Sequence, residues 1–395
     1  MLLAGKRLLR FRTNRAPAVG VGRLSSFGRM GMTLLNRTQL DRVAERLLGA
    51  DGAAATGAAI MKPFDRALWA MLGTGYLVAA FAATRRTDPA FNAAEIGLAN
   101  WIAFMVRTFW VHLGLMTAMG IAVAGLRRRG YLALAAAPLL AWCLGPSVVH
   151  ALTQPTVAHT EPDLRVMSVN LLRSNAHNAD RLLEQVHRAN PDVLVLQEYS
   201  DAWHDRIGPT LAAIYPDHQF DLRNDAYGCA VYSRWPMVGP AQLRLPLGNQ
   251  HVGHMRVVLK QGDRRFVLYN IHLANPASPI SLRQQRAQLA SLQEWVRQEA
   301  LPVLICGDFN ETTRSGGLRC LTALGLQEPD RFAGEAGPTW PANRPLYTWL
   351  GVRIDHMFFS SEFACLCQRL GEPFGSDHLP IVTDFAFVPA TLARR

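Results

Sequence analysis

The hydrophobic pattern divides the chain into two regions with different periods. Before residue 153, three stretches carry almost no charge: Ala67–Thr84, Ile96–Leu126 and Gly130–Leu152. A helix needs about 20 apolar residues to cross a bilayer, and each stretch comes near or exceeds that length. None shows the polar stripe, every three to four residues, that marks a core helix of a soluble protein. The pattern therefore predicts about three transmembrane helices over residues 61–152, with three buried core helices as the alternative.

After residue 163 the pattern changes to short apolar runs separated by turn residues. Residues 153–163 form a polar linker that contains proline, and one folded domain is expected over residues 164–390. Helical patterns lie at Ala179–Arg188 and Ser281–Gln298. Because strands outnumber helices and several neighbours resemble hairpins, we expect an α/β domain with a mixed sheet. The runs with the length and composition of strands are Leu164–Asn170, Asp192–Gln197, Cys229–Ser233, Met255–Leu259, Phe266–Ile271, Val303–Cys306 and Ile354–Phe359.

The second helical pattern is amphipathic. Arg283 and Arg286 are expected on its solvated side, because they fall off the apolar stripe. The stripe itself consists of Leu282, Leu289, Leu292 and Trp295.

The net charge first suggests a nucleic-acid-binding protein. The chain carries 41 Lys+Arg against 30 Asp+Glu, a formal charge of +11, and basic surfaces bind phosphates by releasing counterions. Counted by segment, however, residues 1–60 carry +7, residues 61–160 carry +5, and residues 161–395 carry −1. The basic excess therefore belongs to the N-terminal region and not to the α/β domain.

The positive residues also predict a topology. Lys62 and Arg66 precede the first apolar stretch, and Arg127–Arg129 separates the second from the third. Under the positive-inside rule both loops face the cytoplasm. The chain is then a multi-pass protein of a bacterial inner membrane, with the α/β domain in the periplasm. The Arg-rich residues 1–60 are expected to be disordered, a transit peptide, or an extension before a native start at Met61.

Polar and ionisable residues recur where the apolar strands end. Such a strand holds its terminal side chain rigidly at the rim of the sheet, so several together predict one convergent site. Each residue alone has an ordinary alternative: Glu198 as a solvated loop carboxylate, His272 as a buried core histidine, Asp308 as a turn former. The residues in question are Asn170, Glu198, His272, Asp308, Asn310, Asp355, Asp377 and His378.

Short motifs around these positions carry a family resemblance. The segments SVN, LQE, YSRWP, NIHL, GDFN, TW, RIDHMFFS and SDHLP follow one another from about residue 164 to 386. This set resembles the endonuclease/exonuclease/phosphatase superfamily, which includes deoxyribonucleases, apurinic endonucleases, neutral sphingomyelinases and inositol-polyphosphate phosphatases. The resemblance implies a four-layer α/β/β/α sandwich that hydrolyses phosphate esters with a divalent cation, Mg²⁺ or Mn²⁺. The apolar N-terminal region lies outside it, so the chain looks like a membrane-anchored member.

The resemblance implies a metal site formed by Glu198, Asn170 and, at the same end, Asp377. Carboxylate and amide oxygens suit a hard cation. Leu172 stands where many relatives carry an acidic or polar residue, so that position is not expected to supply a ligand to a first or a second metal ion. His272 stands where apurinic endonucleases typically have Tyr, which argues against repair of abasic sites.

The same resemblance implies the catalytic roles. Asp308 would orient or deprotonate the attacking water, and Asn310 would hold a phosphate oxygen. His378 would stabilise the developing negative charge, with its ring oriented by Asp355. His272 would bind the phosphate from the other side or protonate the leaving oxygen. Displacement at phosphorus needs charge neutralisation, a positioned water and donors to the non-bridging oxygens, and this set supplies all three.

Three functions follow from these observations. The first is a membrane-anchored phosphodiesterase or phosphatase, whose partners are a phosphate-ester substrate and the lipid bilayer. The second is a nuclease acting on DNA or RNA, which the domain charge of −1 disfavours. The third is a non-catalytic, membrane-tethered binding module, disfavoured because every catalytic position carries a competent residue. Five further residues have two alternatives, contact with the substrate or an ordinary surface role, and the surface role is expected for each: His251, His254, His356, Arg173 and Arg234.

Overall fold

The computed structural model describes residues 63–85, 95–152, 161–248, 253–329, 337–343 and 350–388. All of them belong to one compact unit, Ile60–Arg395. The basic segment 1–60, most of the linker 153–163 and His251 lie outside the described residues, so the expectations for them stay predictions.

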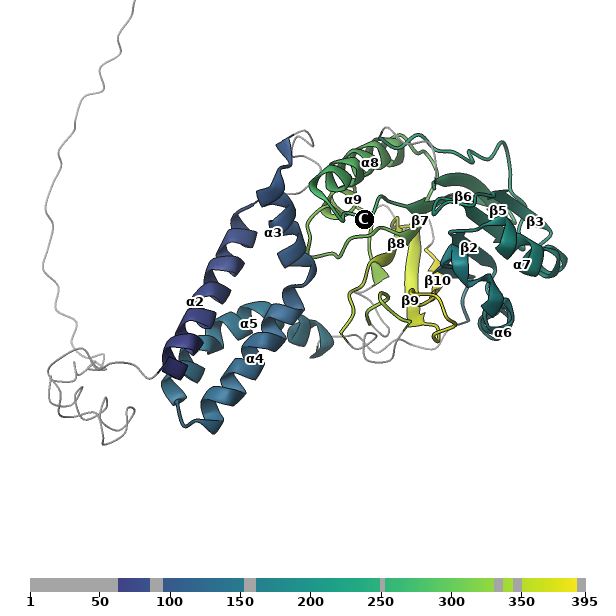
Figure 1. Cartoon of the computed structure of the whole chain (residues 1–395). Helices are drawn as coiled ribbons and strands as arrows, with labels where there is room; N and C mark the ends of the chain where they lie inside the picture. The colour runs from purple at the N-terminus through teal and green to yellow at the C-terminus, as the bar shows by residue number, and fades with distance from the viewer. Residues whose placement is uncertain are drawn as a thin grey trace, which may run out of the picture. The chain divides into compact units, whose positions relative to one another are not determined.

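Two mixed sheets form the centre of the domain (Figure 1). The larger has the strand order β3-β4-β2-β1-β10-β9 and the smaller the order β5-β6-β7-β8. β1 pairs with β2 in parallel, as β6 does with β7, and the remaining neighbours are antiparallel. The strands are β1 Leu164–Asn170, β2 Val193–Gln197, β3 Asp217–Asp221, β4 Cys229–Ser233, β5 Met255–Gln261, β6 Arg264–His272, β7 Val303–Asp308, β8 Asp355–Phe359, β9 Phe363–Leu370 and β10 Ile381–Phe387. The mixed-sheet prediction is therefore confirmed, with the strands divided between two sheets.

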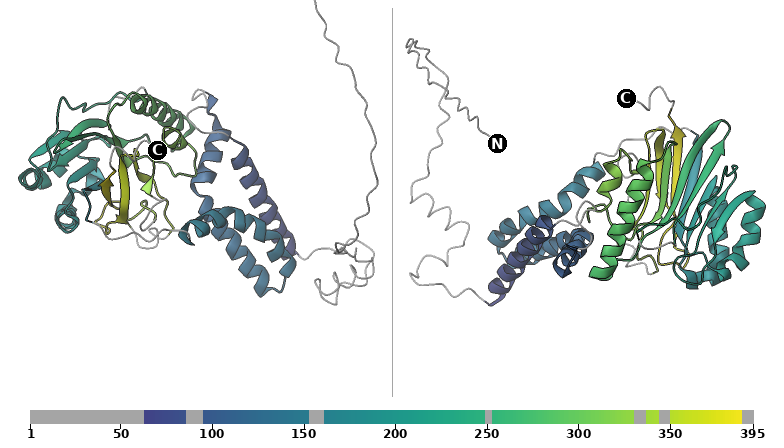
Figure 2. Two further views of the ribbon diagram at one scale, coloured as in Figure 1. Left: turned by 180° about the vertical axis from the view of Figure 1, so that it is seen from behind. Right: turned by 90° about the horizontal axis from the view of Figure 1, so that it is seen from above.

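Helices cover the outer face of each sheet, which makes four layers (Figure 2). Side chains alternate along a strand, and on β6 Leu268 belongs to the core between the sheets whereas Tyr269 belongs to the core under the helices. Three separate hydrophobic cores fill the three interfaces between layers. The predicted α/β/β/α sandwich is thus confirmed. The short helix η2 (Arg173–Asn178) and α6 (Ala179–Ala189) and α7 (Asp201–Ile214) lie on the larger sheet, and α8 (Pro279–Arg297) and α9 (Arg319–Thr322) on the smaller.

Helix α8 corrects one prediction. Ser278 and Ser281 form a capping box at its start, and the predicted apolar stripe is buried apart from the partly exposed Trp295. Arg283 is exposed as expected, but Arg286 is 0% exposed. Its guanidinium donates to both carboxylate oxygens of Glu311, at 2.6 and 2.9 Å, and Glu311 is also fully buried. The expectation of a solvated Arg286 was wrong because a distant loop supplies a buried counter-ion.

The apolar N-terminal region folds into four helices: α2 Pro63–Thr84, α3 Leu98–Thr108, α4 Trp110–Leu126 and α5 Gly130–Leu152. Helix α2 is long and apolar enough to cross a membrane, with a mean hydropathy of 1.5 and only 11% of that window buried. Helices α3 and α4 pass the same test only together, and they are bent by 65° where they meet. The described residues therefore offer one such helix, or two if the bent pair counts as one span, and the three predicted spans stay a prediction.

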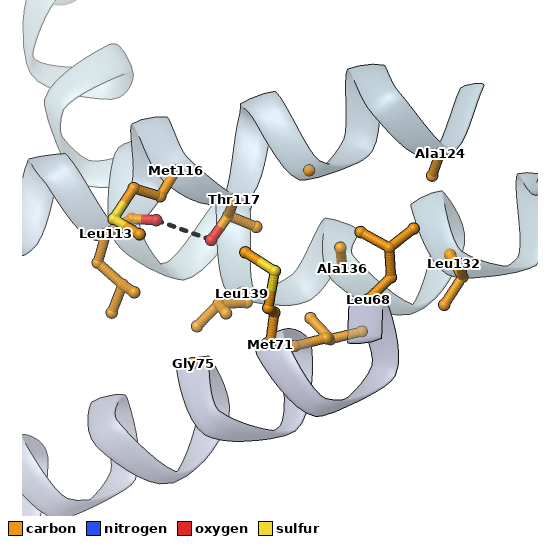
Figure 3. Close-up of a pocket in the computed structure, with 12 residues that line it drawn as sticks. Leu68, Met71, Gly75, Leu113, Met116, Thr117, Ala124, Leu132, Ala136 and Leu139 are labelled. Carbon is orange, nitrogen blue, oxygen red and sulfur yellow. Dashed lines mark hydrogen bonds between the residues drawn. The ribbon is translucent and has the colours of Figure 1, made fainter. Parts of the chain in front are cut away.

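Small and apolar side chains hold these helices together. An apolar cavity of about 90 Å³ lies between α2, α4 and α5, lined by residues such as Met71, Leu113 and Leu139 (Figure 3). The hydroxyl of Thr117 at its edge donates to the Leu113 carbonyl at 2.7 Å. The Thr117 hydroxyl therefore has a hydrogen-bond partner within its own helix, as a polar group in an apolar cavity requires.

Candidate active site

Parallel strands bring four of the predicted residues to one edge of the sandwich. Asn170 ends β1, and Glu198 directly follows its parallel neighbour β2. In the other sheet His272 ends β6 and Asp308 ends β7, and these two residues are paired in register. Because parallel strands end at the same edge of a sheet, the pairing brings Asn170 next to Glu198 in one sheet and His272 next to Asp308 in the other. The packing of the two sheets then brings both pairs to one site.

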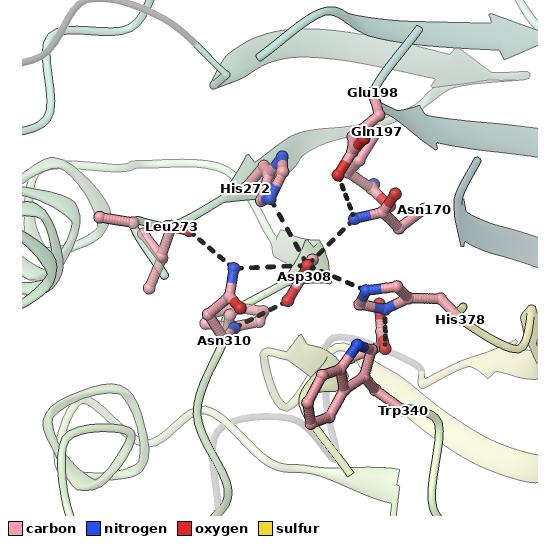
Figure 4. Close-up of polar contacts among 12 residues, drawn as sticks. Asn170, Gln197, Glu198, His272, Leu273, Asp308, Asn310, Trp340 and His378 are labelled. Atoms are coloured by element: carbon pink, nitrogen blue, oxygen red, sulfur yellow. Dashed lines mark hydrogen bonds and ion pairs between the residues drawn. The ribbon is translucent and has the colours of Figure 1, made fainter. Parts of the chain in front are cut away.

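Antiparallel strands supply the remaining residues from their opposite ends. Asp355 begins β8 and lies beside Asp308 in the register of β7 and β8. His378 precedes β10, which runs antiparallel to β1, so it also reaches this edge. Figure 4 shows the side chains of Asn170, His272 and His378 turned toward Asp308.

The carboxylate of Asp308 is the centre of this cluster (Figure 4). Its Oδ2 atom lies 3.1 Å from Asn170 Nδ2, 3.5 Å from His272 Nε2 and 3.6 Å from His378 Nε2. Its Oδ1 atom accepts the backbone N–H of Asn310 at 2.8 Å. Asp308 is 1% exposed, and this burial raises its pKa above the ordinary range, against the opposing effect of the neighbouring histidines. Such a carboxylate is suited to accept a proton.

His378 carries a positive charge in this site. Burial alone would lower its pKa, but the carboxylates of Asp355 and Asp308 raise it to about 10. Its Nδ1 atom lies 2.9 Å from Asp355 Oδ2, which fixes the plane of the ring. The imidazolium is therefore a preorganised donor for a negatively charged group.

Two buried hydroxyls position this ion pair. The Ser376 hydroxyl accepts the backbone N–H of His378 at 3.0 Å and donates to the Asn170 carbonyl at 2.8 Å. Thr339 accepts the Asp355 N–H at 3.2 Å. Neither residue was predicted. Both begin a segment of the resemblance, SDHLP and TW, and that placement is the signal that pointed to them.

The carboxylate of Glu198 lies on the more open side of the cluster. Its Oε1 atom is 3.3 Å from Asn170 Nδ2, and its Oε2 atom accepts the backbone N–H of Arg173 at 3.0 Å. Asp377 lines the same cavity, and its described contact is with the indole N–H of Trp340 at 3.1 Å. The Asn170 amide nitrogen donates to the carboxylates of Glu198 and Asp308, while the Asn170 oxygen accepts the Leu172 backbone N–H at 3.0 Å. The oxygens that this side offers to a hard divalent cation are therefore those of Glu198 and Asp308.

A second grouping of possible ligands consists of Asp308, Asp355 and His378, whose ligand atoms lie within 4.8 Å of one another. In this grouping Asp355 Oδ2 and His378 Nδ1 already form a hydrogen-bonded ion pair. A cation there would displace a buried ion pair, so the side of Glu198 and Asn170 fits a metal better.

Strained backbone surrounds the site. Three residues that are not glycine adopt left-handed φ values, Leu172 at 55°, Glu198 at 57° and Asn310 at 50°. Such conformations cost free energy and persist only where the surroundings enforce them. Gly307, just before Asp308, has a φ of 142°, and a Cβ there would lie 1.9 Å from the Ile271 carbonyl oxygen. The backbone beside both key carboxylates is therefore held in one conformation.

A buried amide pair joins the two sheets below the site. Asn270 donates to the carbonyls of Leu196 and Ala230 at 2.9 and 3.0 Å, and it accepts from Gln197 at 2.8 Å. Sequence reasoning missed this link. The signal was available, because Asn270 precedes His272 by two residues and so shares its face of β6.

Two histidines were wrongly expected at the surface. His254 is 0% exposed, and its Nδ1 atom accepts the backbone N–H of His272 at 3.3 Å. Its burial, reinforced by the nearby His272, lowers its pKa to about 3. His356 is 1% exposed and bonds the Glu311 carbonyl at 2.8 Å. His356 lies on the buried strand β8 and His254 directly precedes β5, whereas Arg173 is exposed as expected.

Comparison with known proteins identifies the family. The sequence model of the Endonuclease/Exonuclease/phosphatase family matches residues 167–378, and the chain belongs to this family. The predicted resemblance is thereby confirmed for the sandwich, and helices α2–α5 lie outside the matched residues. Endonucleases, exonucleases and phosphatases, after which the family is named, act on phosphate ester bonds.

Individual relatives agree with this assignment. Nocturnin of Rattus norvegicus is 25% identical over 256 residues, which is 52% of this chain and 57% of that protein. Nocturnin of Homo sapiens is 26% identical over 251 residues, with the same two shares. The chain thus spans little more than half the length of these curated relatives. The crystal structure of an endonuclease/exonuclease/phosphatase from Beutenbergia cavernae is 25% identical with a TM-score of 0.50, covering 58% of this chain and 73% of its own.

Proposed function

We propose that the chain is a metal-dependent phosphoric ester hydrolase, a phosphodiesterase or phosphatase in which water attacks phosphorus. One observation carries the proposal: a buried Asp308 carboxylate with Asn170, His272 and His378 within 3.1–3.6 Å of a single oxygen. A hydrolytic site needs a proton acceptor, fixed donors and a position for a cation in one place, and this cluster combines them.

Glu198 and Asn170, with Asp377 at the same end of the cavity, would hold the cation, Mg²⁺ or Mn²⁺. When bound, such an ion neutralises charge on the phosphoryl oxygens. The Arg173 backbone N–H donates to Glu198, whereas the Arg173 guanidinium donates to the Asn224 carbonyl at 2.9 Å.

The remaining side chains perform the proton transfers and bind the phosphoryl group. Asp308 would take a proton from water as the water oxygen forms its bond to phosphorus. The ester P–O bond breaks, and His272 would give a proton to the leaving oxygen. The His378 imidazolium and the Asn310 amide would donate to the non-bridging oxygens, where negative charge increases in the transition state.

We also propose that the helical region anchors the enzyme in a bacterial inner membrane with the sandwich in the periplasm. Helix α2 supports this, because only 11% of its apolar window is buried, unlike a core helix. Alkaline phosphatase fused after residue 388 should be active in the periplasm. An inactive but stable fusion would place the sandwich in the cytoplasm.

The metal dependence is tested on the full chain in detergent. Hydrolysis of bis(p-nitrophenyl) phosphate should stop on chelation and return with Mg²⁺ or Mn²⁺. Glu198→Gln should raise the Mg²⁺ concentration needed for half-maximal rate at least about tenfold, since it removes one carboxylate ligand. Glu184→Gln, the same change on an exposed face of α6, is the matched control. Equal metal requirements in the two variants would refute the assigned metal site.

A further inference from the structure

The catalytic cavity is bounded by two different kinds of surface. It encloses about 560 Å³, and its floor carries Glu198, His272, Asp308 and His378. Part of its wall comes from outside the sandwich, from α3 and the bend before α4, through Phe104, Met105, Thr108 and Phe109. The helical region therefore contributes directly to the surface that meets a substrate.

Polar contacts fix this wall to the sandwich. The Trp101 indole donates to the Pro276 carbonyl at 2.8 Å, and the hydroxyls of Thr108 and Ser315 lie 2.9 Å apart. Arg283 donates to the Ile96 carbonyl at 2.7 Å.

Buried contacts reinforce the same attachment. Phe104, 1% exposed, packs with Ile96 and Leu282 in one hydrophobic cluster. The buried Arg286 lies 5.4 Å from the centre of the Phe104 ring while it binds Glu311, which directly follows Asn310. The wall of α3 and the catalytic loop are thus joined through one arginine.

The chemistry of the lining restricts the substrate. Among the described residues around the cavity there is no Lys or Arg, whereas three carboxylates are present. A nucleic-acid strand brings several phosphates, which proteins neutralise with clustered Lys and Arg. A single phosphoryl group attached to a hydrocarbon matches this lining better. Its charge would contact the polar residues His272 and His378, and its hydrocarbon would contact the apolar side chains of α3.

We propose that the substrate is an amphiphilic phosphate ester whose hydrocarbon lies against Phe104, Met105 and Phe109 and which enters from the bilayer. This inference rests on the proposed hydrolase function. Helices α3 and α4 continue the wall into a surface with exposed apolar side chains such as Ile102, Leu115 and Met119, at 41%, 43% and 63%. A lipid-like ester can reach the site along such a surface without leaving an apolar environment.

The test compares two esters with the same leaving group, methyl p-nitrophenyl phosphate and dodecyl p-nitrophenyl phosphate, on the full chain in detergent micelles. The dodecyl ester should have a kcat/KM at least about tenfold higher, because several methylenes become buried. Met105→Gln should reduce this ratio at least about threefold, since a polar amide replaces an apolar contact. Met71→Gln is the matched control: it makes the same change on α2, where Met71 is 59% exposed and does not line the catalytic cavity, and it should keep the ratio.

The outcomes separate the two proposals. Equal kcat/KM for both esters, or an undiminished ratio in Met105→Gln, would overturn the amphiphilic substrate while methyl-ester turnover leaves the hydrolase standing. Turnover of neither ester with Mg²⁺ or Mn²⁺ would overturn the hydrolase itself. A single-stranded oligonucleotide cleaved faster than the dodecyl ester would overturn the inference in favour of a nuclease.

Discussion

The sandwich buries most of its large apolar side chains, whereas helices α2–α5 leave many of theirs exposed. Of the 19 large apolar side chains exposed among the described residues, 16 lie on the helices, and the remaining three are Ile214, Ile280 and Leu350. The sandwich closes three cores between its own layers, so its surface is left polar. The helices bury mainly small residues against one another and leave their large side chains outward. The exposed apolar side chains of α2–α5 support the proposal that these helices lie in a membrane, whereas the sandwich buries most of its large apolar side chains in its own cores.

A large effect on activity is expected from the ion pair of Asp355 and His378 in the sandwich. Asp355→Asn should lower kcat about 100-fold, because the His378 ring loses its orienting carboxylate. The same change removes a negative charge that raises the pKa of His378, so the alkaline limb of the pH–rate profile should move to lower pH. Rates measured from pH 5 to 10 check both effects. A lower rate with an unmoved profile would show that Asp355 acts only on folding.

Arg286 connects helix α3 to the loop of the catalytic site, and its substitution tests this connection. Arg286→Met should destabilise the chain by about 3–5 kcal/mol, because it leaves Glu311 as an unpaired buried charge. Thermal unfolding in detergent measures the change. Arg297→Met, on the same helix but in an exposed pair with Glu294, is the control and should leave the melting temperature nearly unchanged. Similar shifts in the two variants would contradict the buried pair.

Two leucines, one buried in the sandwich and one exposed on α2, test the difference in burial between the two regions. Leu268→Ala, between the two sheets and 0% exposed, should cost about 2–5 kcal/mol because it leaves a cavity. Leu77→Ala, on α2 and 73% exposed, should change the stability in detergent little. Equal losses in thermal unfolding would mean that α2 is a core helix like any other.

The smallest effect concerns the buried His254. Its pKa of about 3 lies below the ordinary value near 6.5, so between these values the folded chain binds fewer protons than the unfolded one. Its contribution to stability is therefore complete above about pH 6.5 and lost as the pH falls toward 3. His254→Gln should flatten the decline of the melting temperature between pH 6.5 and 4, whereas the exposed His177→Gln should not. An unchanged slope in His254→Gln would contradict this role.

Sequence patterns predicted those parts of the fold that local residues determine. Apolar runs gave seven of the strands, and their final residues gave the edge at which the site forms. Three strands were missed. The strands β3 and β9 lie at the edges of the larger sheet and have few buried side chains, DHQFD in β3 being mostly polar. The strand β10, IVTDFAF, was missed because Thr383 and Asp384 interrupt its apolar run. Helix α7 was missed because Pro209 interrupts its pattern.

Long-range contacts account for the remaining differences. The partner of Arg286 lies 25 residues away, and no helical period reveals it. The hydroxyls of Ser376 and Thr339 gain their role only from the loops that meet at Asn170 and Asp355, although both residues begin a segment of the resemblance, SDHLP and TW. Hydropathy gave the length of the apolar stretches but not the 65° bend between α3 and α4. That bend is what brings Phe109 to the catalytic cavity.

The most direct test of the hydrolase is the substitution of Asp308 alone. Asp308→Asn preserves the shape of the side chain but cannot take the proton from water, and kcat/KM for bis(p-nitrophenyl) phosphate with Mg²⁺ should fall at least about 1,000-fold. Asp263→Asn, the same change in the exposed turn between β5 and β6, should retain the wild-type rate. Wild-type kcat/KM in Asp308→Asn would contradict the account.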